Sequence, residues 1–262
     1  MRLIKLNKSV SRAIDILTLI SKSDKHLTLT EIAKKLDIPK SSALDVIQTL
    51  LAKDFIEVEN AQAKTYRIGI SIFTIGTKSI QDNNLQEAAT EVLTNLSQKT
   101  QKTIFLGVPK NDKVIYVSKL EGNSPVQSSA TIGSDNPMHL TGIGKAILAA
   151  MPLEEIAILY QNEPYESRTK NSITTYHELV SSLTEIRQTG YAIDDREGTE
   201  YIYCFAAPIY NYSNKVVAAL SVASLAEEVG RLEQKLYPEL VVTAALEISK
   251  KLGYTQNKLY KG

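Results

Sequence analysis

The chain of 262 residues is long for one domain and suits two. Hydrophobic residues make up 43% of it and charged residues 23%, which is typical of globular proteins. No run approaches the ~20 apolar residues of a membrane span, the N-terminus lacks the apolar core of a signal peptide, and a single cysteine rules out an intrachain disulfide framework. We therefore expect a cytoplasmic protein that makes no membrane contact.

The net charge of +1 hides an uneven distribution. Residues 1–80 hold 13 Lys and Arg against 8 Asp and Glu, a net of +5, whereas residues 81–262 hold 17 against 21, a net of −4. A basic first part joined to an acidic second part fits a DNA-binding head attached to a domain of another kind. The alternative is random variation.

An amphipathic helix is predicted first, because five apolar residues near the N-terminus share one side at helical spacing. They are Val10, Ala13, Ile14, Leu17 and Ile20.

Residues 28–53 predict two helices joined by a tight turn. Thr28 and Glu31 have the spacing of a capping box, in which each side chain accepts a hydrogen bond from the other residue's backbone N–H. Pro39 ends the first helix and suits the entry to the second, because the residue before a proline is pushed out of the helical region.

The second helix, residues 40–53, has an apolar and a polar side. Its buried set is Ala43, Val46, Ile47 and Leu50, and its outward set is Ser42, Leu44, Asp45, Gln48, Thr49 and Lys53. Small polar groups at the N-terminus and amide-bearing side chains along one side suit a DNA major groove. An ordinary helical hairpin within a bundle is the alternative.

Two β-rich runs, residues 55–58 and 65–68, follow directly and are separated by a polar stretch, which predicts a hairpin. A helix-turn-helix followed by a hairpin is a winged helix, whose wing can lie along the phosphate backbone.

Five motifs in this part stand in a specific order and spacing. They are SVSRAIDIL (9–17), LTEIA (29–33), PKSS (39–42), QTL (48–50) and YRIG (66–69). Through them the domain resembles the N-terminal domain of IclR-type transcriptional regulators. Leu44 and Asp45 depart from the His-Arg pair that the family often carries, and Asp37 from its glycine, so the resemblance does not extend to the operator sequence.

The DNA contacts expected of this domain come from one helix and the wing. Lys40, Ser41 and Ser42 would anchor phosphate, Gln48 and Asp45 would touch base edges beside Thr49, and Arg67 would hold the backbone near the wing.

Residues 70–83 predict a helical linker with Ile72, Phe73, Ile75 and Ile80 roughly on one side. This side would pack either against a partner chain or within the same subunit. The resemblance favours the partner chain, because family members pair through this region and bind operators with half-site symmetry.

The remainder mixes helices with strands and predicts an α+β domain with a mostly antiparallel sheet. Helices are expected at 85–96, 142–151, 154–161, 179–190 and 227–252, and strands at 103–108, 114–120, 126–132, 191–194, 205–210 and 216–223. The last helix would bury Val229, Leu232, Leu236, Leu240, Val241 and Leu246.

Four motifs in this part, PMHLTGIGKA (137–146), GYAIDDRE (190–197), CFAAPI (204–209) and AALSV (218–222), are similar to landmarks of the IclR effector domain, a GAF-like sheet flanked by helices. The resemblance implies a pocket for a small organic or sugar acid, without a cofactor. Its residues would be Gly142, Ile143, Asp194, Cys204 and Ser221.

The residues themselves suggest what each group would do. Glycines at a helix start let backbone N–H groups approach a carboxylate or phosphate, and Asp194 with Asp195 can accept hydrogen bonds from ligand hydroxyls. Each residue also has a purely structural alternative. Gly142 and Gly144 could allow a tight helix entry, Cys204 could be a small buried hydrophobe, and Asp194 and Asp195 could be solvated turn residues.

Two other classes of protein are alternatives. A hydrolase would need Cys204 as nucleophile, His139 as base and Asp194 or Asp195 to orient it, and nothing in the sequence brings these together. The histidines lack spaced metal-ligand partners, so no metal site is expected. A winged helix that binds protein instead of DNA is the second alternative.

The prediction is therefore a ligand-responsive regulator, expected to be a repressor, that binds a pseudo-palindromic operator as a homodimer or dimer of dimers. Its parts would be a winged helix at 1–69, a linker helix at 70–83 and a GAF-like effector-binding and oligomerisation domain at 84–262.

Overall fold

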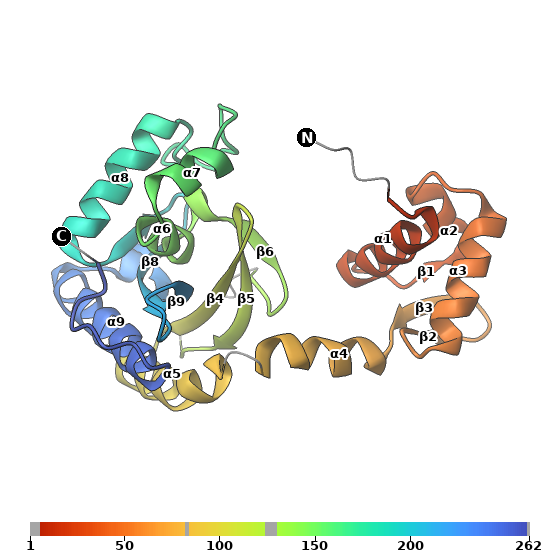
Figure 1. Cartoon of the computed structure of the whole chain (residues 1–262), viewed down its shortest axis with the longest axis horizontal. Helices are drawn as coiled ribbons and strands as arrows, with labels where there is room; N and C mark the ends of the chain where they lie inside the picture. Colours follow the sequence, from red (N-terminus) through yellow and green to blue (C-terminus); the bar gives the residue numbers. More distant parts are fainter. Residues whose placement is uncertain (1–5, 82–83, 124–129, 261–262) are drawn as a thin grey trace. The chain divides into compact units, whose positions relative to one another are not determined.

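The computed structural model describes residues 6–81, 84–123 and 130–260, with the backbone alone for residues 77–81. The chain divides into two compact units, Met1–Asn83 and Asn84–Gly262. Figure 1 shows a head of small helices with a short hairpin, and a second unit built on one curled sheet. The expected α+β class, with a winged helix followed by an antiparallel sheet domain, is confirmed.

The head is a winged helix. Its helices are α1 (Lys8–Lys22), α2 (Leu29–Lys35) and α3 (Lys40–Ala52), and its strands, in the order β1-β3-β2, are β1 (Leu27–Thr28), β2 (Ile56–Asn60) and β3 (Thr65–Ile68). The capping box at α2 is present, since Glu31 N donates to Thr28 Oγ1 at 3.3 Å and Thr28 N donates to Glu31 Oε2 at 2.8 Å. Strand β1 was not predicted from the sequence.

The buried side of α1 differs from the prediction. Val10 and Ile14 are both 58% exposed, whereas Ile16 is fully buried and Ile20 nearly so. The helix packs through Ala13, Ile16, Leu17 and Ile20, which have the i, i+3, i+4, i+7 spacing of a single stripe. The predicted set mixed two adjacent sides of the helix, because apolar residues occur on both.

The linker forms helix α4 (Ile70–Gln81). Gly69 directly precedes this helix, and a Cβ atom there would lie 2.2 Å from the Asp54 carbonyl oxygen, so this position needs glycine. Phe73 is 68% exposed and Ile75 59% exposed, and Ile72 is half-buried. The side chain of Ile80, which completes the predicted apolar side, lies outside the described residues.

Within the described residues, the second unit holds one six-stranded antiparallel sheet in the order β6-β5-β4-β9-β8-β7. The strands are β4 (Thr103–Lys110), β5 (Lys113–Leu120), β6 (Asp135–Pro137), β7 (Ala192–Asp195), β8 (Ile202–Tyr210) and β9 (Val216–Leu225). The helices are α5 (Leu85–Thr100), α6 (Gly142–Ala149), α7 (Leu153–Leu159), α8 (Tyr176–Thr189) and α9 (Arg231–Lys251).

The alternation of side chains along β8 assigns a helix to each face of the sheet. Phe205 points to α9, where its ring lies 6.0 Å from that of Tyr237. Its neighbours Cys204 and Ala206 point to the other face, toward Gly142 of α6. Figure 1 shows the same arrangement, with α5 beside α9 and with α6 near α8. The cavity described below lies on the α6 face.

Two predictions for this unit are wrong in detail. No strand forms at Ala130–Ile132, and the neighbouring pairing is made by β6; residues 126–129 of the predicted strand lie outside the described residues. In α9, Leu232 is 69% exposed and Leu236 41% exposed. That helix packs instead through Tyr237, Val241, Ala244, Ala245 and Ile248, whose small residues allow close approach to the sheet. In the described part of the chain, no helix is long and apolar enough to cross a membrane.

Candidate functional site

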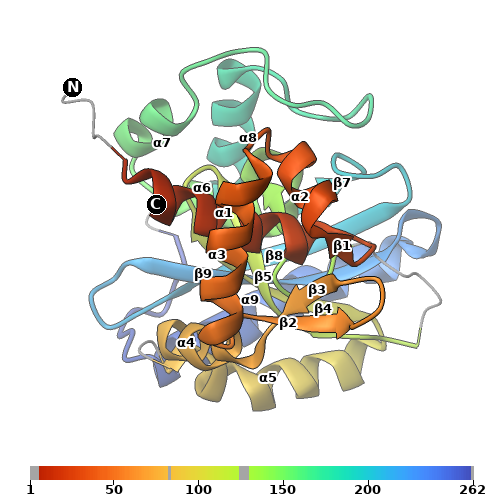
Figure 2. The same ribbon diagram turned by 90° about the vertical axis from the view of Figure 1, so that its right-hand side faces the viewer.

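Helix α3 presents a polar surface on the outside of the head. Ala43, Ile47 and Leu50 are buried beneath it. Of the predicted contact residues on this helix, Lys40, Ser41, Asp45, Gln48 and Thr49 are exposed and Ser42 is half-buried. In Figure 2, α3 crosses in front of α1, with the β2–β3 hairpin beside it.

The N-terminus of α3 is open to a ligand. Pro39 occupies the cap position and makes no side-chain capping hydrogen bond. The first N–H groups of a helix have no carbonyl partner within it and attract anions. Lys40 and Ser41 are exposed beside these groups, so the helix start can accept a phosphate.

Two of the side chains predicted to contact DNA already have hydrogen-bond partners within the head. Thr49 Oγ1 donates to the carbonyl of Asp45 at 2.9 Å. Arg67 donates from Nε and Nη2 to Glu57 Oε2 at 3.0 and 2.8 Å, and its Nη1 lies 2.9 Å from Glu59 Oε2. The hydrogen bond that Arg67 donates to Glu57 is the main reason that the pKa of Arg67 is raised. The sequence alone did not show this, because the pair forms through the register of the hairpin.

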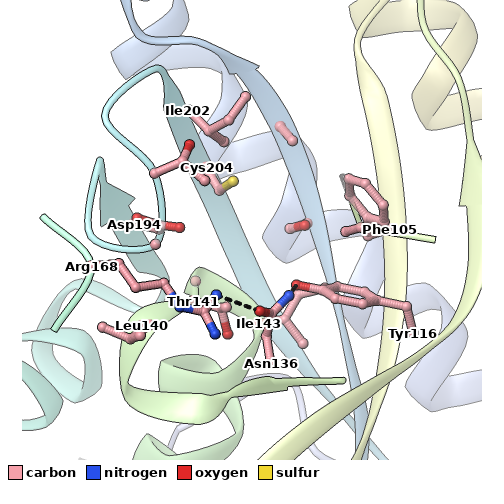
Figure 3. Close-up of a pocket in the computed structure, with 16 residues that line it drawn as sticks. Phe105, Tyr116, Asn136, Leu140, Thr141, Ile143, Arg168, Asp194, Ile202 and Cys204 are labelled. Carbon is pink, nitrogen blue, oxygen red and sulfur yellow. Dashed lines mark hydrogen bonds between the residues drawn. The ribbon is translucent and has the colours of Figure 1, made fainter. Parts of the chain in front are cut away.

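A cavity of about 80 Å³ lies on the α6 face of the sheet in the second unit. It brings together all five residues predicted for the effector site: Gly142, Ile143, Asp194, Cys204 and Ser221. Figure 3 shows Asp194 and Cys204 on one side of it and Phe105 with Tyr116 across from them.

Strand register explains why these distant residues meet. Cys204 pairs with Asp194 of β7 and with Ala223 of β9, so three neighbouring strands each present one residue on the same face. Ser221 stands two residues before Ala223 on β9, and so on the same face, and it pairs with Phe105 of β4. All of these residues line the cavity.

The two glycines at the start of α6 have different roles. A Cβ atom on Gly144 would lie 2.2 Å from the backbone of Met138, so Gly144 is needed for packing. A Cβ atom on Gly142 would lie 3.4 to 3.6 Å from Ala206, Cys204 and Asp194, in space that the cavity uses. The helix is capped by Thr141 Oγ1, which accepts from Gly144 N at 3.0 Å.

Three buried charged groups lie together beside the cavity. Asp194 Oδ1 accepts from the backbone N–H of Glu197 at 2.8 Å, and Lys145 Nζ makes an ion pair with Glu197 Oε1. Burial, followed by repulsion from Glu197, raises the pKa of Asp194 to about 7. Burial also raises the pKa of Glu197. Glu197 Oε2 is buried without a hydrogen-bond partner among the described residues.

Sequence reasoning missed several residues that line the cavity, among them Phe105, Tyr116, Asn136 and Arg168. Phe105 and Tyr116 sit on predicted strands, and their rings lie 5.1 Å apart. Arg168 lies in the irregular connection between α7 and α8, where no periodic pattern indicates which way a side chain points.

The structure does not assemble the hydrolase alternative. His139 packs between the rings of Tyr160 and Tyr165, at 5.7 and 5.5 Å, and does not line the cavity that holds Cys204. Burial raises the pKa of the Cys204 thiol well above its usual value and lowers that of His139, the reverse of an activated pair. Asp195 makes an ion pair with Arg196 at 2.6 Å.

A winged helix with an exposed polar recognition helix, followed by a sheet domain whose cavity is lined by polar and apolar side chains, defines the class of ligand-responsive DNA-binding regulators. Comparison with protein families identifies the family. Residues 9–59 match the "IclR helix-turn-helix domain", and residues 77–250 match "Bacterial transcriptional regulator IclR C-terminal". The chain belongs to the IclR family of transcriptional regulators, and this is not a family of enzymes.

Relatives extend over nearly the whole chain. The HTH-type transcriptional regulator XynR of Escherichia coli (strain K12) is 30% identical over 247 residues, which cover 94% of this chain and 98% of that protein. The HTH-type transcriptional repressor AllR of the same strain is 26% identical over 246 residues, which cover 94% of this chain and 90% of that protein. The structure of an IclR homolog from Microbacterium hydrocarbonoxydans, complexed with 4-hydroxybenzoate, is 19% identical in sequence and has a TM-score of 0.82. The match covers 93% of this chain and 98% of that one, and at this identity it supports the fold alone.

Proposed function

We propose that this regulator is a cytoplasmic repressor that binds a pseudo-palindromic operator as a homodimer or dimer of dimers and is controlled by a small organic acid. The observation that carries the DNA part is the polar outward side of α3, which the core of the head leaves exposed. A relative that is itself named a repressor supports the direction of control.

The roles on α3 follow from position along the helix. Lys40, Ser41 and Ser42 hold phosphate at the open helix start, where the helix dipole adds to the positive charge. Gln48 can make two hydrogen bonds to adenine, and Asp45 can accept one from the amino group of cytosine. Thr49 lies on the same side and contacts DNA through its methyl group, because its hydroxyl is bonded within the helix.

Arg67 can contact DNA only if it gives up its present ion pairs. Its guanidinium must exchange Glu57 and Glu59 for phosphate, while both carboxylates remain close enough to repel that phosphate. The wing is therefore a weaker contributor to binding than the start of α3.

The effector class follows from the cavity. The first-turn N–H groups of Gly142 and Ile143 favour an anion, Asp194 accepts a hydrogen bond from a hydroxyl, and Cys204 and Ser221 supply small polar contacts. A volume of about 80 Å³ holds only a few water-sized groups, which favours a small organic acid over a sugar acid. The 4-hydroxybenzoate bound by the Microbacterium homologue is also an organic acid.

The proposed pairing of chains draws on α4, whose exposed Phe73 and Ile75 are large apolar groups in water. Covering them with the same helix of a second copy would form a two-fold interface, which matches the symmetry of a pseudo-palindromic operator.

The test is a DNA-binding titration on the sequence that the full chain selects from a random library. We expect small organic acids to weaken operator binding by wild type at least tenfold, while Asp194→Ala binds the operator normally and no longer responds. Operator binding that no small acid changes would contradict the effector class. Loss of DNA binding by Asp194→Ala would assign Asp194 to folding.

A further inference from the structure

The effector cavity is lined by one cation, Arg168, among the described residues, and the proposed function gives this residue no role so far. We propose that Arg168 recognises the carboxylate of the effector, by exchanging its present hydrogen bond to Asn136 for one to the ligand. This inference rests on the proposed function, since it names the residue that reads the acid group in the same cavity.

The guanidinium is already placed as a hydrogen-bond donor in the cavity. Arg168 Nη1 donates to Asn136 Oδ1 at 2.6 Å, and Asn136 Nδ2 in turn donates to Tyr116 Oη at 3.4 Å. Figure 3 shows the Arg168 side chain reaching in from its loop to Asn136, near Thr141 at the start of α6. The cation and the helix start therefore border the same part of the cavity.

Arg168 has hydrogen-bond donors that a ligand could use. Its Nε donates to Glu166 Oε1 at 2.7 Å, which fixes the outer edge of the guanidinium. Its Nη2 has no hydrogen-bond partner among the described residues. A carboxylate that replaced the neutral Asn136 oxygen could bridge Nη1 and Nη2, in the paired geometry that makes charge-assisted hydrogen bonds strong. The exchange costs one bond to a neutral amide and forms two to an anion.

The loop that carries Arg168 is tied to the segment that carries Asp194. Thr169 Oγ1 donates to the carbonyl of Arg196 at 2.6 Å, Asn171 Nδ2 to that of Asp195 at 2.9 Å, and Ser172 Oγ to that of Glu197 at 2.8 Å. These bonds hold the only two charged side chains that line the described cavity, Arg168 and Asp194, at a fixed spacing.

The same loop is held from a second element. His139 Nε2 lies 2.9 Å from the carbonyl oxygen of Glu166, which requires the proton on Nε2. Glu166 stands two residues before Arg168, and His139 is buried between two tyrosine rings. A cation on an anchored loop loses little conformational entropy when a ligand binds.

The charges also set the orientation of the ligand. The carboxylate would lie at Arg168 beside the start of α6, and a hydroxyl of the same molecule would lie at Asp194. A neutral analogue of the acid keeps the second contact and loses the first. That difference makes the proposal measurable without knowledge of the natural effector.

The test is calorimetric titration of the full chain with acetate, glycolate and lactate, each compared with its amide. For the tightest of these acids, we expect wild type to bind the amide at least tenfold more weakly. Arg168→Gln should lose at least tenfold in affinity for the acid and bind the amide as wild type does. Arg168→Lys should lie between the two, because it keeps the charge and loses the paired donors.

The matched control is Arg196→Gln, which removes an exposed arginine that also pairs with a carboxylate but does not line the cavity. It should bind the acid as wild type does. The proposal is overturned if none of the acids binds wild type, if an amide binds as tightly as its acid, or if Arg168→Gln binds the acid normally. In each case, sequence-specific DNA binding by wild type shows that the proposed regulator survives; its absence shows that the proposed function has failed as well.

Discussion

Gln48 and Lys40 lie on the same helix and are expected to do different things to DNA. Gln48→Ala removes an amide that can pair with a base edge, so it should reduce discrimination at one base pair by ~1–3 kcal/mol. Lys40→Ala removes a phosphate contact and should weaken every sequence alike. Competition titrations with single-base variants of the selected site separate the two effects. A uniform loss for both variants would show that Gln48 does not read a base.

Asp194 is also expected to shape the pH dependence of folding. Burial raises its folded-state pKa to about 7, above the unfolded value, so the folded protein binds more protons between about pH 4 and pH 7. The free energy of unfolding should therefore fall as the pH rises through this window. The contribution of this one group is up to about 4 kcal/mol.

Asp194→Asn cannot ionise and should lose that contribution. Urea denaturation at pH 5 and pH 8 measures it, because the difference in stability between wild type and variant should shift in favour of the variant at the higher pH. Equal shifts with pH in both proteins would mean that Asp194 is not ionised at a cost in the folded state.

At the scale of elements, the two glycines at the start of α6 are expected to have different roles: Gly144 serves packing and Gly142 serves ligand binding. Gly144→Ala places a methyl group 2.2 Å from the Met138 backbone and should destabilise the unit by several kcal/mol, on the order of 3. Gly142→Ala meets only ordinary contact distances and should leave the melting temperature nearly unchanged. Its methyl group occupies the cavity, so acid binding should fall at least tenfold. Thermal unfolding and calorimetry on both variants test this, and normal acid binding by Gly142→Ala would contradict it.

Elements whose signal is local were predictable from the sequence. The Thr28 capping box, the stop at Pro39 and the end of α8 at Gly190 each depend on residues a few positions apart, and the structure contains all three. Helix α5 was also expected, at 85–96, and its apolar residues occur on one side, which is the side that is buried. In α1 and α9 apolar residues occur on more than one side, and only tertiary packing decides which side is buried.

The candidate site was predictable where a motif resembles the family and not elsewhere. The motifs led to Gly142, Asp194 and Cys204, and the strand register brings these together. Arg168 reaches the cavity from an irregular loop held by hydrogen bonds to the β7–β8 segment. The carboxylates around Arg67 depend on hairpin register. Neither arrangement produces a periodic pattern in the sequence from which it could be predicted.

At the scale of the whole molecule, the effector controls DNA binding only through its different affinities for the operator-binding and non-binding states. A tenfold change in operator affinity needs ~1.4 kcal/mol of such a difference, which one charge-assisted contact can supply.

Pairing of chains belongs to the same scale. Phe73→Asp puts a charge on the exposed side of α4 and should shift the protein toward the monomer, with at least a tenfold loss in operator affinity. Tyr212→Asp is the control, because Tyr212 is 79% exposed and lies on a turn of the second unit. Sedimentation velocity reports the outcome. An unchanged oligomeric state in Phe73→Asp would show that chains do not pair through this side of α4.

The central claim is that the outward side of α3 enters the major groove. The most direct measurement places a photo-cross-linking amino acid at position 48 of the full chain and maps where it attaches to the selected DNA. The account predicts cross-links at two symmetric positions on major-groove base edges, absent with shuffled DNA and absent when the same group replaces Thr243, an exposed residue of α9. Equal cross-linking of selected and shuffled DNA, or none from position 48, would contradict it.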